Sequence, residues 1–317
     1  MKRYIVTGCS GFIGRHLTKS LLSDGHQVLG FDNFHNGRKS NMDEFYHNPN
    51  FVFSQTDLSN LDDIKKLKPL YYPFDGVFHV AFVPRVQYSI ENPLSTDRNN
   101  VGMTINLLEF MVASKIKNIV FSSSSSVYGD PRELPTTEKH PLNPLSPYAV
   151  QKMNSEEYIK QYSRLYNINF TNLRYFNVYG EFQDPSGEYA NLIPRTINRC
   201  LNGEKPIVYG DGKNQRDFVY VEDVVNANKK AMELTSEKSL GAINICSSSP
   251  HTINDIVNTI AQLTGYTGGI EYRPKRVEPT ITYGDNSRAQ EILKWKPQVS
   301  FEESLDREVR YFKTCVR

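Results

Sequence analysis

Short apolar runs alternate with stretches of helical periodicity through the first half of the chain. The runs that predict strands, rich in β-branched and aromatic residues, cover residues 3–7, 27–31, 51–54, 76–80, 119–122 and 170–173. Between the first two runs, Ile13, Leu17 and Leu21 recur at the spacing of one helix face. Strands that alternate with helices indicate βαβ units, and right-handed crossovers then favour a doubly wound α/β fold with a parallel sheet.

The composition of the sequence changes after about residue 176, where turn-forming residues become frequent, as in Asp184-Pro185-Ser186-Gly187. We therefore expect a cofactor-binding domain over residues 1–176 that also receives about 218–245. A smaller, substrate-binding C-terminal lobe would comprise residues 177–217 and 246–317. The length of 317 residues is long for a single core and agrees with two units.

Composition and charge argue against several classes of protein. Hydrophobic residues make up 38% and charged residues 23%, which is typical of a globular chain rather than a disordered one. The net charge of +2 gives no sign of a nucleic-acid partner or an anionic membrane surface, and no apolar run reaches the roughly 18 residues of a membrane span. The four cysteines lack paired metal spacing, so we expect no metal and a reducing, cytoplasmic compartment.

A glycine-rich segment follows the first predicted strand and opens the first predicted helix. Gly8, Gly11 and Gly14 have the spacing G-x-x-G-x-x-G. Glycine lets the backbone turn tightly and approach a pyrophosphate, while the helix N-terminus supplies free N–H groups and a partial positive charge. The segment therefore predicts a dinucleotide site, although a glycine-rich turn without a ligand is the alternative.

An acidic residue at the end of the second strand bears on the choice of dinucleotide. Asp32 lies 18 residues after Gly14, where a carboxylate can bind the adenosine ribose diol. Because this carboxylate would repel a 2′-phosphate, NAD is favoured over NADP. Arg38 and Lys39 lie nearby and keep NADP open, since basic side chains can hold that phosphate.

A tyrosine and a lysine occupy one face of a predicted helix. Ser146 can cap this helix and Pro147 suits its first position. Tyr148 and Lys152 are then four residues apart, with roughly 5–6 Å between their Cβ atoms. A neighbouring ammonium and a positive nicotinamide ring both favour the phenolate, which makes Tyr148 a candidate acid/base. The alternative is an ordinary surface or core tyrosine.

Five consecutive serines, Ser122 to Ser126, follow the fifth predicted strand. A serine at the carboxyl end of a parallel strand points into the crevice where ligands bind. Its hydroxyl can hydrogen-bond a substrate oxygen while a proton moves. Alone, the same run would be a polar, flexible loop.

Taken in order, the segments TGCSGFIG, SSSSSVYG, SPYAVQK, LRYFNVYG and YGDGKNQRDFVYVEDV carry a more specific signal. The chain resembles the extended short-chain dehydrogenases that act on nucleotide sugars, and among them UDP-glucose and UDP-N-acetylglucosamine 4-epimerases. The resemblance runs over nearly the whole chain, to Trp295. It implies a Rossmann-type sheet, NAD as the cofactor, a UDP-sugar as the substrate and a homodimer.

The resemblance also assigns roles to individual residues. Ser124, Tyr148 and Lys152 would be catalytic. The residues expected to hold the cofactor are Gly8, Gly11, Phe12, Ile13, Gly14, Asp32, Asn33, Asp57, Leu58, Ala81, Asn99, Ser122, Tyr148 and Lys152. The residues expected to hold the substrate are Ser124, Asn177, Asn191, Arg216, Arg276 and Thr282, the last because a small residue there leaves room for an N-acetyl group. For Arg216 the alternative is an ordinary ion pair with Asp217.

Several departures from the family pattern leave the exact substrate open, and related reactions of the same fold are the alternatives. Gly180-Glu181-Phe182-Gln183 stands where G-P-R-Q is common, Met103 where a glycine is usual, and Arg276-Val277-Glu278 lacks a common glycine. The 4,6-dehydratases of this fold carry acids at the positions of Ser125 and Ser126, and UDP-glucuronate decarboxylases carry one at Ser126, so this chain lacks the acids that those two rival reactions use. UDP-glucuronate 4-epimerisation and a silent, NAD-binding regulator complete the alternatives.

The implied homodimer would be built from helices near residues 100–114 and 148–166. Apolar Met103, Leu107 and Ile159 on these helices are the sequence motive for this expectation. A stripe that faces the core is the alternative.

Overall fold

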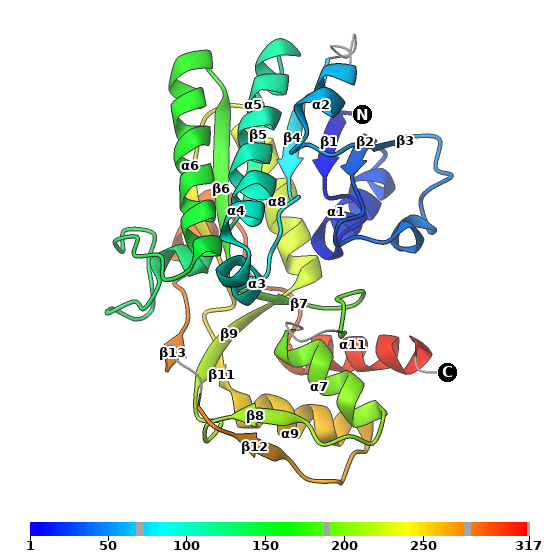
Figure 1. Ribbon diagram of the computed structural model, residues 1–317, viewed down its shortest axis with the longest axis vertical. Coiled ribbons are helices and arrows are strands. Elements are labelled where there is room, and N and C mark those ends of the chain that lie inside the picture. Colours follow the sequence, from blue (N-terminus) through cyan, green and yellow to red (C-terminus); the bar gives the residue numbers. More distant parts are fainter. Residues whose placement is uncertain (68–72, 187–190, 276–279, 316–317) are drawn as a thin grey trace.

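The computed structural model describes residues 1–67, 73–186, 191–275 and 280–315, which form two lobes of unequal size (Figure 1). The larger lobe contains the N-terminus and a broad sheet between two layers of helices. The smaller lobe lies beyond one end of that sheet and contains the C-terminal helix.

Seven parallel strands form the sheet of the larger lobe, in the order β10-β6-β5-β4-β1-β2-β3. They are β1 (Arg3–Thr7), β2 (Gln27–Asp32), β3 (Phe51–Gln55), β4 (Gly76–His79), β5 (Asn118–Ser124), β6 (Asn169–Tyr175) and β10 (Gly241–Ile245). The order reverses between β1 and β4, which opens a crevice at the carboxyl ends of these strands. The doubly wound, Rossmann-type fold expected from the sequence is confirmed.

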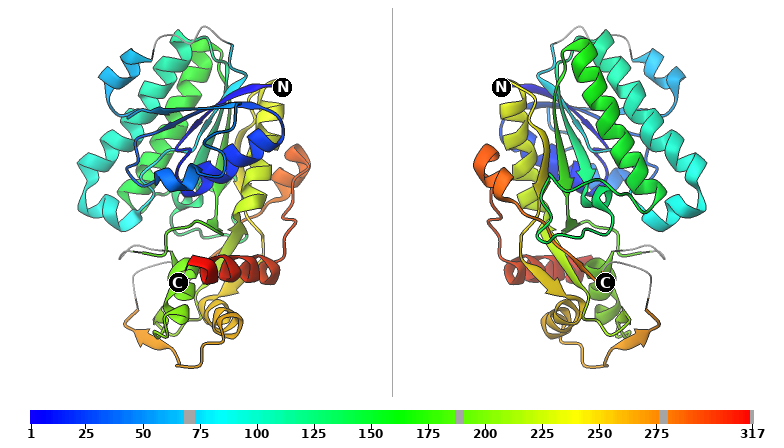
Figure 2. Two further views of the ribbon diagram at one scale, coloured as in Figure 1. Left: turned by 90° about the vertical axis from the view of Figure 1, so that its right-hand side faces the viewer. Right: turned by 90° about the vertical axis from the view of Figure 1, so that its left-hand side faces the viewer.

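Helices cover both faces of this sheet (Figure 2). One face packs on α1 (Phe12–Ser23), α8 (Val221–Thr235) and α10 (Ser287–Leu293), and the other on α5 (Met103–Ala113) and α6 (Pro147–Tyr166). The alternation of strand residues explains the two cores, because Tyr4 and Val6 belong to the first and Ile5 to the second. Shorter elements complete the lobe: α2 (Leu61–Lys66), α3 (Val86–Glu91), α4 (Pro93–Asp97), the 3-10 turns η1 (Lys39–Met42) and η3 (Ser125–Tyr128), and the π-helical turn η2 (Arg98–Gly102).

The smaller lobe is built from short strands and three helices. Its elements are β7 (Asn177–Tyr179), α7 (Leu192–Leu201), β8 (Ile207–Tyr209), β9 (Gln215–Tyr220), β11 (Pro250–Thr252), α9 (Ile253–Thr264), β12 (Glu271–Arg273), β13 (Ile281–Thr282) and α11 (Phe301–Cys315). β9 pairs with β7, β11 and β13, whereas β8 pairs with β12. Ile197 of α7, Ile260 of α9 and Val309 of α11 meet in one apolar core.

The expected division of the chain changes at two places. β9 lies wholly in the smaller sheet, so the return to the larger lobe begins with α8 at Val221 rather than at residue 218. The assignment of all of 246–317 to the smaller lobe is wrong for α10 and the turn after it. Ala289, Leu293 and Trp295 are buried in the core of the larger lobe, and the Trp295 indole N–H donates to the Asp223 carbonyl at 2.9 Å.

The apolar residues expected at a dimer face lie inside the protein. Met103, Leu107 and Ile159 are buried in the core between the sheet and helices α5 and α6. The core-facing alternative is therefore correct for these three residues. Helical periodicity identified an apolar stripe, but it does not say what covers the stripe.

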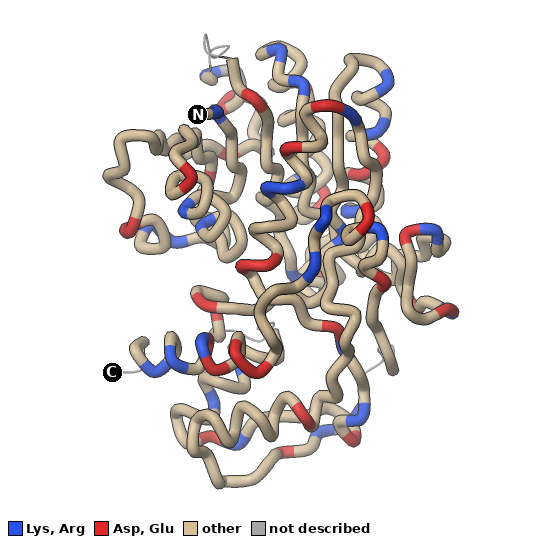
Figure 3. The backbone as a smooth tube through the Cα atoms, turned by 180° about the vertical axis from the view of Figure 1, so that it is seen from behind, with Lys and Arg blue, Asp and Glu red and all other residues tan. Residues whose placement is uncertain are grey.

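Charge and metal-ligating residues are dispersed. Basic and acidic positions alternate over both lobes (Figure 3). Within the described ranges no helix is long and apolar enough to cross a bilayer, and no group of three or more His, Cys, Asp or Glu side chains is placed to hold a metal ion. Cys9, Cys200 and Cys246 are buried free thiols, and Cys315 is an exposed one.

Candidate active site

A cleft of about 2020 Å³ lies at the carboxyl ends of the large sheet and continues along the smaller lobe. A site for one drug-sized ligand typically occupies about 300–1,000 Å³, so this cleft has room for more than one. The predicted site residues that line it are Gly8, Gly11, Phe12, Ile13, Gly14, Asp32, Asn33, Asp57, Ala81, Asn99, Ser122, Ser124, Tyr148, Lys152, Asn177, Asn191, Arg216 and Thr282. The Leu58 side chain is buried in the core near α5, directly after the lining residue Asp57, so a contact of Leu58 with the cofactor stays a prediction. Arg276 lies outside the described residues.

The glycine-rich loop passes very close to the end of β4. Gly8 has φ +72°, and a Cβ there would lie 2.9 Å from the backbone of Ala81. A Cβ on Gly14 would lie 1.9 Å from the Gly8 carbonyl oxygen. Side chains are therefore excluded, and α1 begins beside the cleft with Gly11 at its N-cap and no acidic residue in its first turn. This is a cradle suited to a pyrophosphate.

Asp32 closes the second strand with its carboxylate held by backbone groups. It accepts hydrogen bonds from the N–H of Ser10 at 3.0 Å and of Phe34 at 2.8 Å. Arg38 pairs with Asp184 at 3.5 Å, and the Lys39 ammonium lies 5.5 Å from the centre of the Tyr46 ring. The two basic residues thus have other partners, which favours a ribose diol over a 2′-phosphate beside Asp32.

Other residues predicted to hold a cofactor make local contacts on the cleft wall. Asp57 accepts from the N–H and the hydroxyl of Ser59 at 2.9 and 2.7 Å, and Asn99 donates to the Ser95 carbonyl at 2.8 Å. The neighbouring Asn100, which the sequence did not single out, is buried. It accepts from the Val83 N–H at 2.7 Å and donates to Gln151 at 2.8 Å, so it ties the segment after β4 to helix α6.

The three residues expected to be catalytic meet at the start of α6. Ser146 caps this helix by accepting from the Ala149 N–H, which fixes Tyr148 and Lys152 on successive turns. The Lys152 ammonium donates to the Ser122 carbonyl at 2.5 Å, and the Tyr148 hydroxyl has a hydrogen bond with Ser124. A hydroxyl, a phenol and an ammonium therefore lie close together on the cleft wall, and we call Ser124, Tyr148 and Lys152 the catalytic row.

Burial shifts the pKa values of Tyr148 and Lys152 in opposite directions. It raises the pKa of Tyr148 to about 12, and the hydrogen bond with Ser124 opposes that rise. Burial also holds the pKa of Lys152 well below its usual value, while the Glu156 carboxylate acts in the opposite direction. Tyr148 therefore needs nearby positive charge to become a phenolate near neutral pH.

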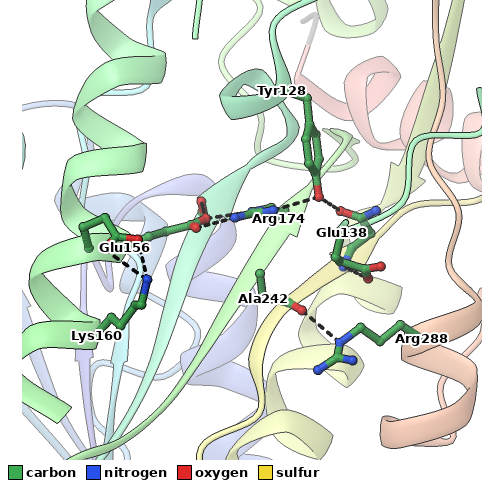
Figure 4. Close-up of polar contacts among 10 residues, drawn as sticks. Tyr128, Glu138, Glu156, Lys160, Arg174, Ala242 and Arg288 are labelled. Carbon is green, nitrogen blue, oxygen red and sulfur yellow. Dashed lines mark hydrogen bonds and ion pairs between the residues drawn. The ribbon is translucent and has the colours of Figure 1, made fainter. Parts of the chain in front are cut away.

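A buried polar network centred on Arg174 and Glu156 joins the strand and the helix that carry these residues (Figure 4). Arg174 of β6 binds Glu156 of α6 through two hydrogen bonds, at 2.6 and 3.0 Å. Arg174 also donates to the Tyr128 hydroxyl at 3.0 Å, which in turn donates to Asn244 of β10 at 2.7 Å. Ser123 donates to Glu156 at 2.5 Å. The network thus joins the turn η3, helix α6 and the three strands β5, β6 and β10, and sequence reasoning missed it because its members are far apart in the chain.

The residues expected to hold the substrate lie on short elements of the smaller lobe. Thr282 of β13 stands opposite Arg216 of β9, and both line the cleft. Asn177 donates to the Asp217 carbonyl at 2.7 Å, and exposed Asn191 precedes α7. The Asp217 carboxylate accepts from the N–H groups of Ser247 and Ser248 at 2.8 and 3.0 Å, so it stabilises the end of β10 and the strand that follows.

The segment that departs from the family pattern connects the two lobes. The Phe182 ring lies 3.2 Å from the Arg15 guanidinium of α1 and 4.5 Å from the Tyr311 ring of α11, centre to centre. The Tyr220 hydroxyl lies 2.8 Å from each carboxylate oxygen of Glu181 and shares its one proton between them. Phe182 therefore links α1 to α11, and Glu181 ties the same segment to β9.

Comparison with known proteins identifies the family. The model of the NAD dependent epimerase/dehydratase family matches residues 4–246. The chain belongs to this family. It is 34% identical to the UDP-glucose 4-epimerase of Mycolicibacterium smegmatis, over 98% of both chains. It is also similar to the UDP-N-acetylglucosamine 4-epimerase of Methanobrevibacter ruminantium in complex with UDP-N-acetylmuramic acid (TM-score 0.92, 35% identity, 99% of both chains).

A third relative extends the range of substrates. The UDP-glucuronic acid 4-epimerase of Bacillus cereus, solved with UDP-glucuronic acid and NAD, has a TM-score of 0.90, is 30% identical and covers 99% of both chains. NAD is the cofactor of this family, and the glycine cradle and Asp32 fit it. The chain is thus a nucleotide-sugar epimerase or a related enzyme of the extended short-chain dehydrogenase type, and its substrate is the open point.

Proposed function

We propose that this protein inverts C4 of a UDP-sugar through a transient 4-keto intermediate, acting on the UDP-glucose/UDP-galactose pair, the N-acetylated pair, or both. The observation that carries the proposal is the row of Ser124, Tyr148 and Lys152 on the cleft wall, beside a cradle suited to NAD. Bound NAD supplies a hydride acceptor and donor, and the chain supplies orientation and proton transfer.

Tyr148 is the proton carrier in this proposal. Its phenolate takes the proton of the C4 hydroxyl as the C4 hydride leaves, and its phenol returns the proton after the keto sugar has turned. Ser124 hydrogen-bonds the same substrate oxygen, and the Lys152 ammonium lowers the cost of the phenolate. Such proton transfer typically contributes about 10²–10⁴ in rate.

The smaller lobe would hold the nucleotide. Arg216 and Asn177 line the cleft where a diphosphate would extend from the sugar, and a guanidinium suits this task because its fork binds two oxygens and stays charged. We extend the same role to Arg276 and place Asn191 near the nucleotide. Thr282 would stand beside C2 of the sugar.

UDP-glucuronate 4-epimerisation is the second candidate, because a relative that covers the whole chain has that activity in its name. It would use the same three residues on a sugar with a carboxylate at C6. Elimination and decarboxylation have less support, because Ser125 and Ser126 line the cleft where those enzymes carry acids.

A product assay tests the proposal. The protein is incubated with UDP-glucose, UDP-N-acetylglucosamine and UDP-glucuronate in turn, and the C4 epimers are separated by chromatography. We expect a C4 epimer from at least one of the first two sugars. A C4 epimer from UDP-glucuronate alone would favour the second candidate, and a dehydrated sugar or a UDP-pentose would contradict both.

The proposal includes a cytoplasmic homodimer. The unpaired state of all four cysteines supports a reducing compartment. Exposed apolar residues on α6, namely Tyr158, Leu165 and Tyr166, replace the buried ones as the motive for a dimer face. Light scattering at micromolar concentration should give twice the chain mass, and Leu165→Glu should shift it toward the monomer. A monomeric wild type would contradict this part.

A further inference from the structure

The ammonium of Lys152 lies among aromatic rings that come from three different elements. Its Nζ atom is 3.5 Å from the centre of the Phe82 ring, 4.8 Å from that of Phe121 and 5.8 Å from that of Tyr148. Phe82 follows β4, Phe121 belongs to β5 and Tyr148 to α6. With 3% of its surface exposed, Lys152 has the Ser122 carbonyl as its hydrogen-bond partner.

Phe82 is the ring in closest contact and also the ring that links the others. Its centre lies 5.8 Å from that of Tyr148 in an edge-to-face arrangement and 6.2 Å from that of Phe121. It is half-buried and lines the cleft, whereas Phe121 is fully buried. The ring therefore fills the space between the segment after β4 and the catalytic row.

The charged groups near Lys152 largely cancel. Glu156 lies one turn further along α6 than Lys152, and Arg174 of β6 binds its carboxylate bidentately. His79 of β4 is buried between Thr7 and Thr104, and burial lowers its pKa to about 3, so it is neutral. Tyr175 of β6 stays a phenol because burial raises its pKa to about 12.

The ammonium is thus buried beside the Glu156 carboxylate, whose charge Arg174 already balances. Burial in this arrangement favours the uncharged amine of Lys152. A ring face attracts a cation through its quadrupole, and this attraction grows when water is excluded. We propose that Phe82 is a positioning residue whose ring face keeps Lys152 charged and holds its ammonium in place beside Tyr148. The inference rests on the proposed role of Lys152 as the ammonium that supports the Tyr148 phenolate.

The test measures the protonation of Lys152 directly. Protein labelled with ¹³C at the lysine Cε is titrated by NMR, with and without saturating NAD, and the Lys152 resonance is assigned from its loss in Lys152→Met. In Phe82→Leu, which removes the ring face but keeps apolar bulk, we expect the equilibrium to shift about tenfold toward the amine, with the midpoint at lower pH. Phe82→Tyr keeps a ring face and should titrate as the wild type does.

A second variant and a second readout guard against misfolding. Phe82→Met also lacks the ring face, and thermal unfolding by circular dichroism shows which variants are folded. The alkaline limb of kcat/KM should move to lower pH in Phe82→Leu and Phe82→Met but not in Phe82→Tyr. Unchanged Lys152 midpoints in the folded Leu or Met variant would overturn the proposal.

The outcome is separable from that of the proposed function. A wild type that inverts no UDP-sugar, but whose Lys152 midpoint falls when the ring is removed, refutes the function and supports the role of Phe82. If the wild type is an epimerase but Lys152 titrates identically in the variants that lack the Phe82 ring, the function is supported and the role of Phe82 is refuted.

Discussion

Two parts of the cleft are built in opposite ways. We call the part at the start of α6 the catalytic corner and the part formed by the smaller lobe the substrate side. Tyr148, Lys152 and Ser124 stand on a 20-residue helix and a seven-residue strand, behind which Glu156 and Arg174 form a buried ion pair. Thr282 stands on a two-residue strand, and β7, which carries Asn177, has three residues. In the proposed mechanism the chemistry depends on long elements and a connected network, whereas the sugar would meet short elements that tolerate change. Such a division agrees with the different sugars in the names of relatives with the same fold.

The most severe test of this contrast removes the proton carrier. Tyr148→Phe keeps the ring but loses the hydroxyl, so turnover should fall by about 10² or more while binding of NAD and UDP-sugar persists. Steady-state rates with calorimetry for both ligands measure the two effects. A variant that retains near-wild-type turnover would remove Tyr148 from the mechanism.

The second test asks whether the network behind the catalytic corner is as stabilising as its burial indicates. Arg174→Met leaves Glu156 buried without its partner and should lower the free energy of unfolding by about 3–5 kcal/mol. The matched control is Arg307→Met, since Arg307 of α11 pairs with Glu222 and Glu303 at the surface and should cost less than about 1 kcal/mol. Urea unfolding measures both, and equal losses would contradict the contrast.

The third test concerns Asp32, at the cofactor end of the cleft. Wild-type protein should bind NAD far better than NADP because the carboxylate repels a 2′-phosphate. Asp32→Asn removes the charge and keeps one acceptor oxygen, which can serve the N–H of Ser10 or of Phe34 but not both, because the two bond different carboxylate oxygens. It should narrow the preference for NAD over NADP by about ten- to a hundredfold. Calorimetry with both dinucleotides is the measurement. Equal affinity of the wild type for the two would show that Arg38 or Lys39 holds the phosphate after all.

The sequence predicted those features of the site that depend on local spacing. The six strands follow from short apolar runs, the glycine cradle from the spacing of three glycines, and the Tyr148–Lys152 face from the helical repeat. Each of these signals depends only on residues that are close together in the sequence. The pairing of Glu156 with Arg174 and the contact of Phe82 with Lys152 depend on elements brought together by the sheet order. Trp295 and α10 were assigned to the wrong lobe for the same reason. Periodicity also misplaced Met103, Leu107 and Ile159, because an apolar stripe looks the same against a core and against a partner.

The last test addresses the substrate side, where we expect the smallest effect. Thr282 lines the cleft opposite Arg216, and Tyr283, the aromatic neighbour that a one-residue shift would bring to this wall, is not among the described lining residues. A threonine leaves space that an acetamido group needs, so we expect the wild type to turn over UDP-N-acetylglucosamine. Thr282→Tyr would overfill that space and should lower kcat/KM for the N-acetylated sugar at least about fivefold, with UDP-glucose much less affected.

Thr282→Ser is the matched control for this test, because it keeps the hydroxyl and the space and should leave both sugars unchanged. A wild type that ignores the N-acetylated sugar, or a Thr282→Tyr variant that lowers the rates on both sugars equally, would show that the pocket is closed elsewhere. Glu181 and Phe182 would then be the next positions to vary, because their contacts with Tyr220, Arg15 and Tyr311 link α1 of the larger lobe to β9 and α11 of the smaller lobe. These positions lie outside the elements that carry Ser124, Tyr148 and Lys152, so we expect sugar preference to change there while the catalytic row is retained.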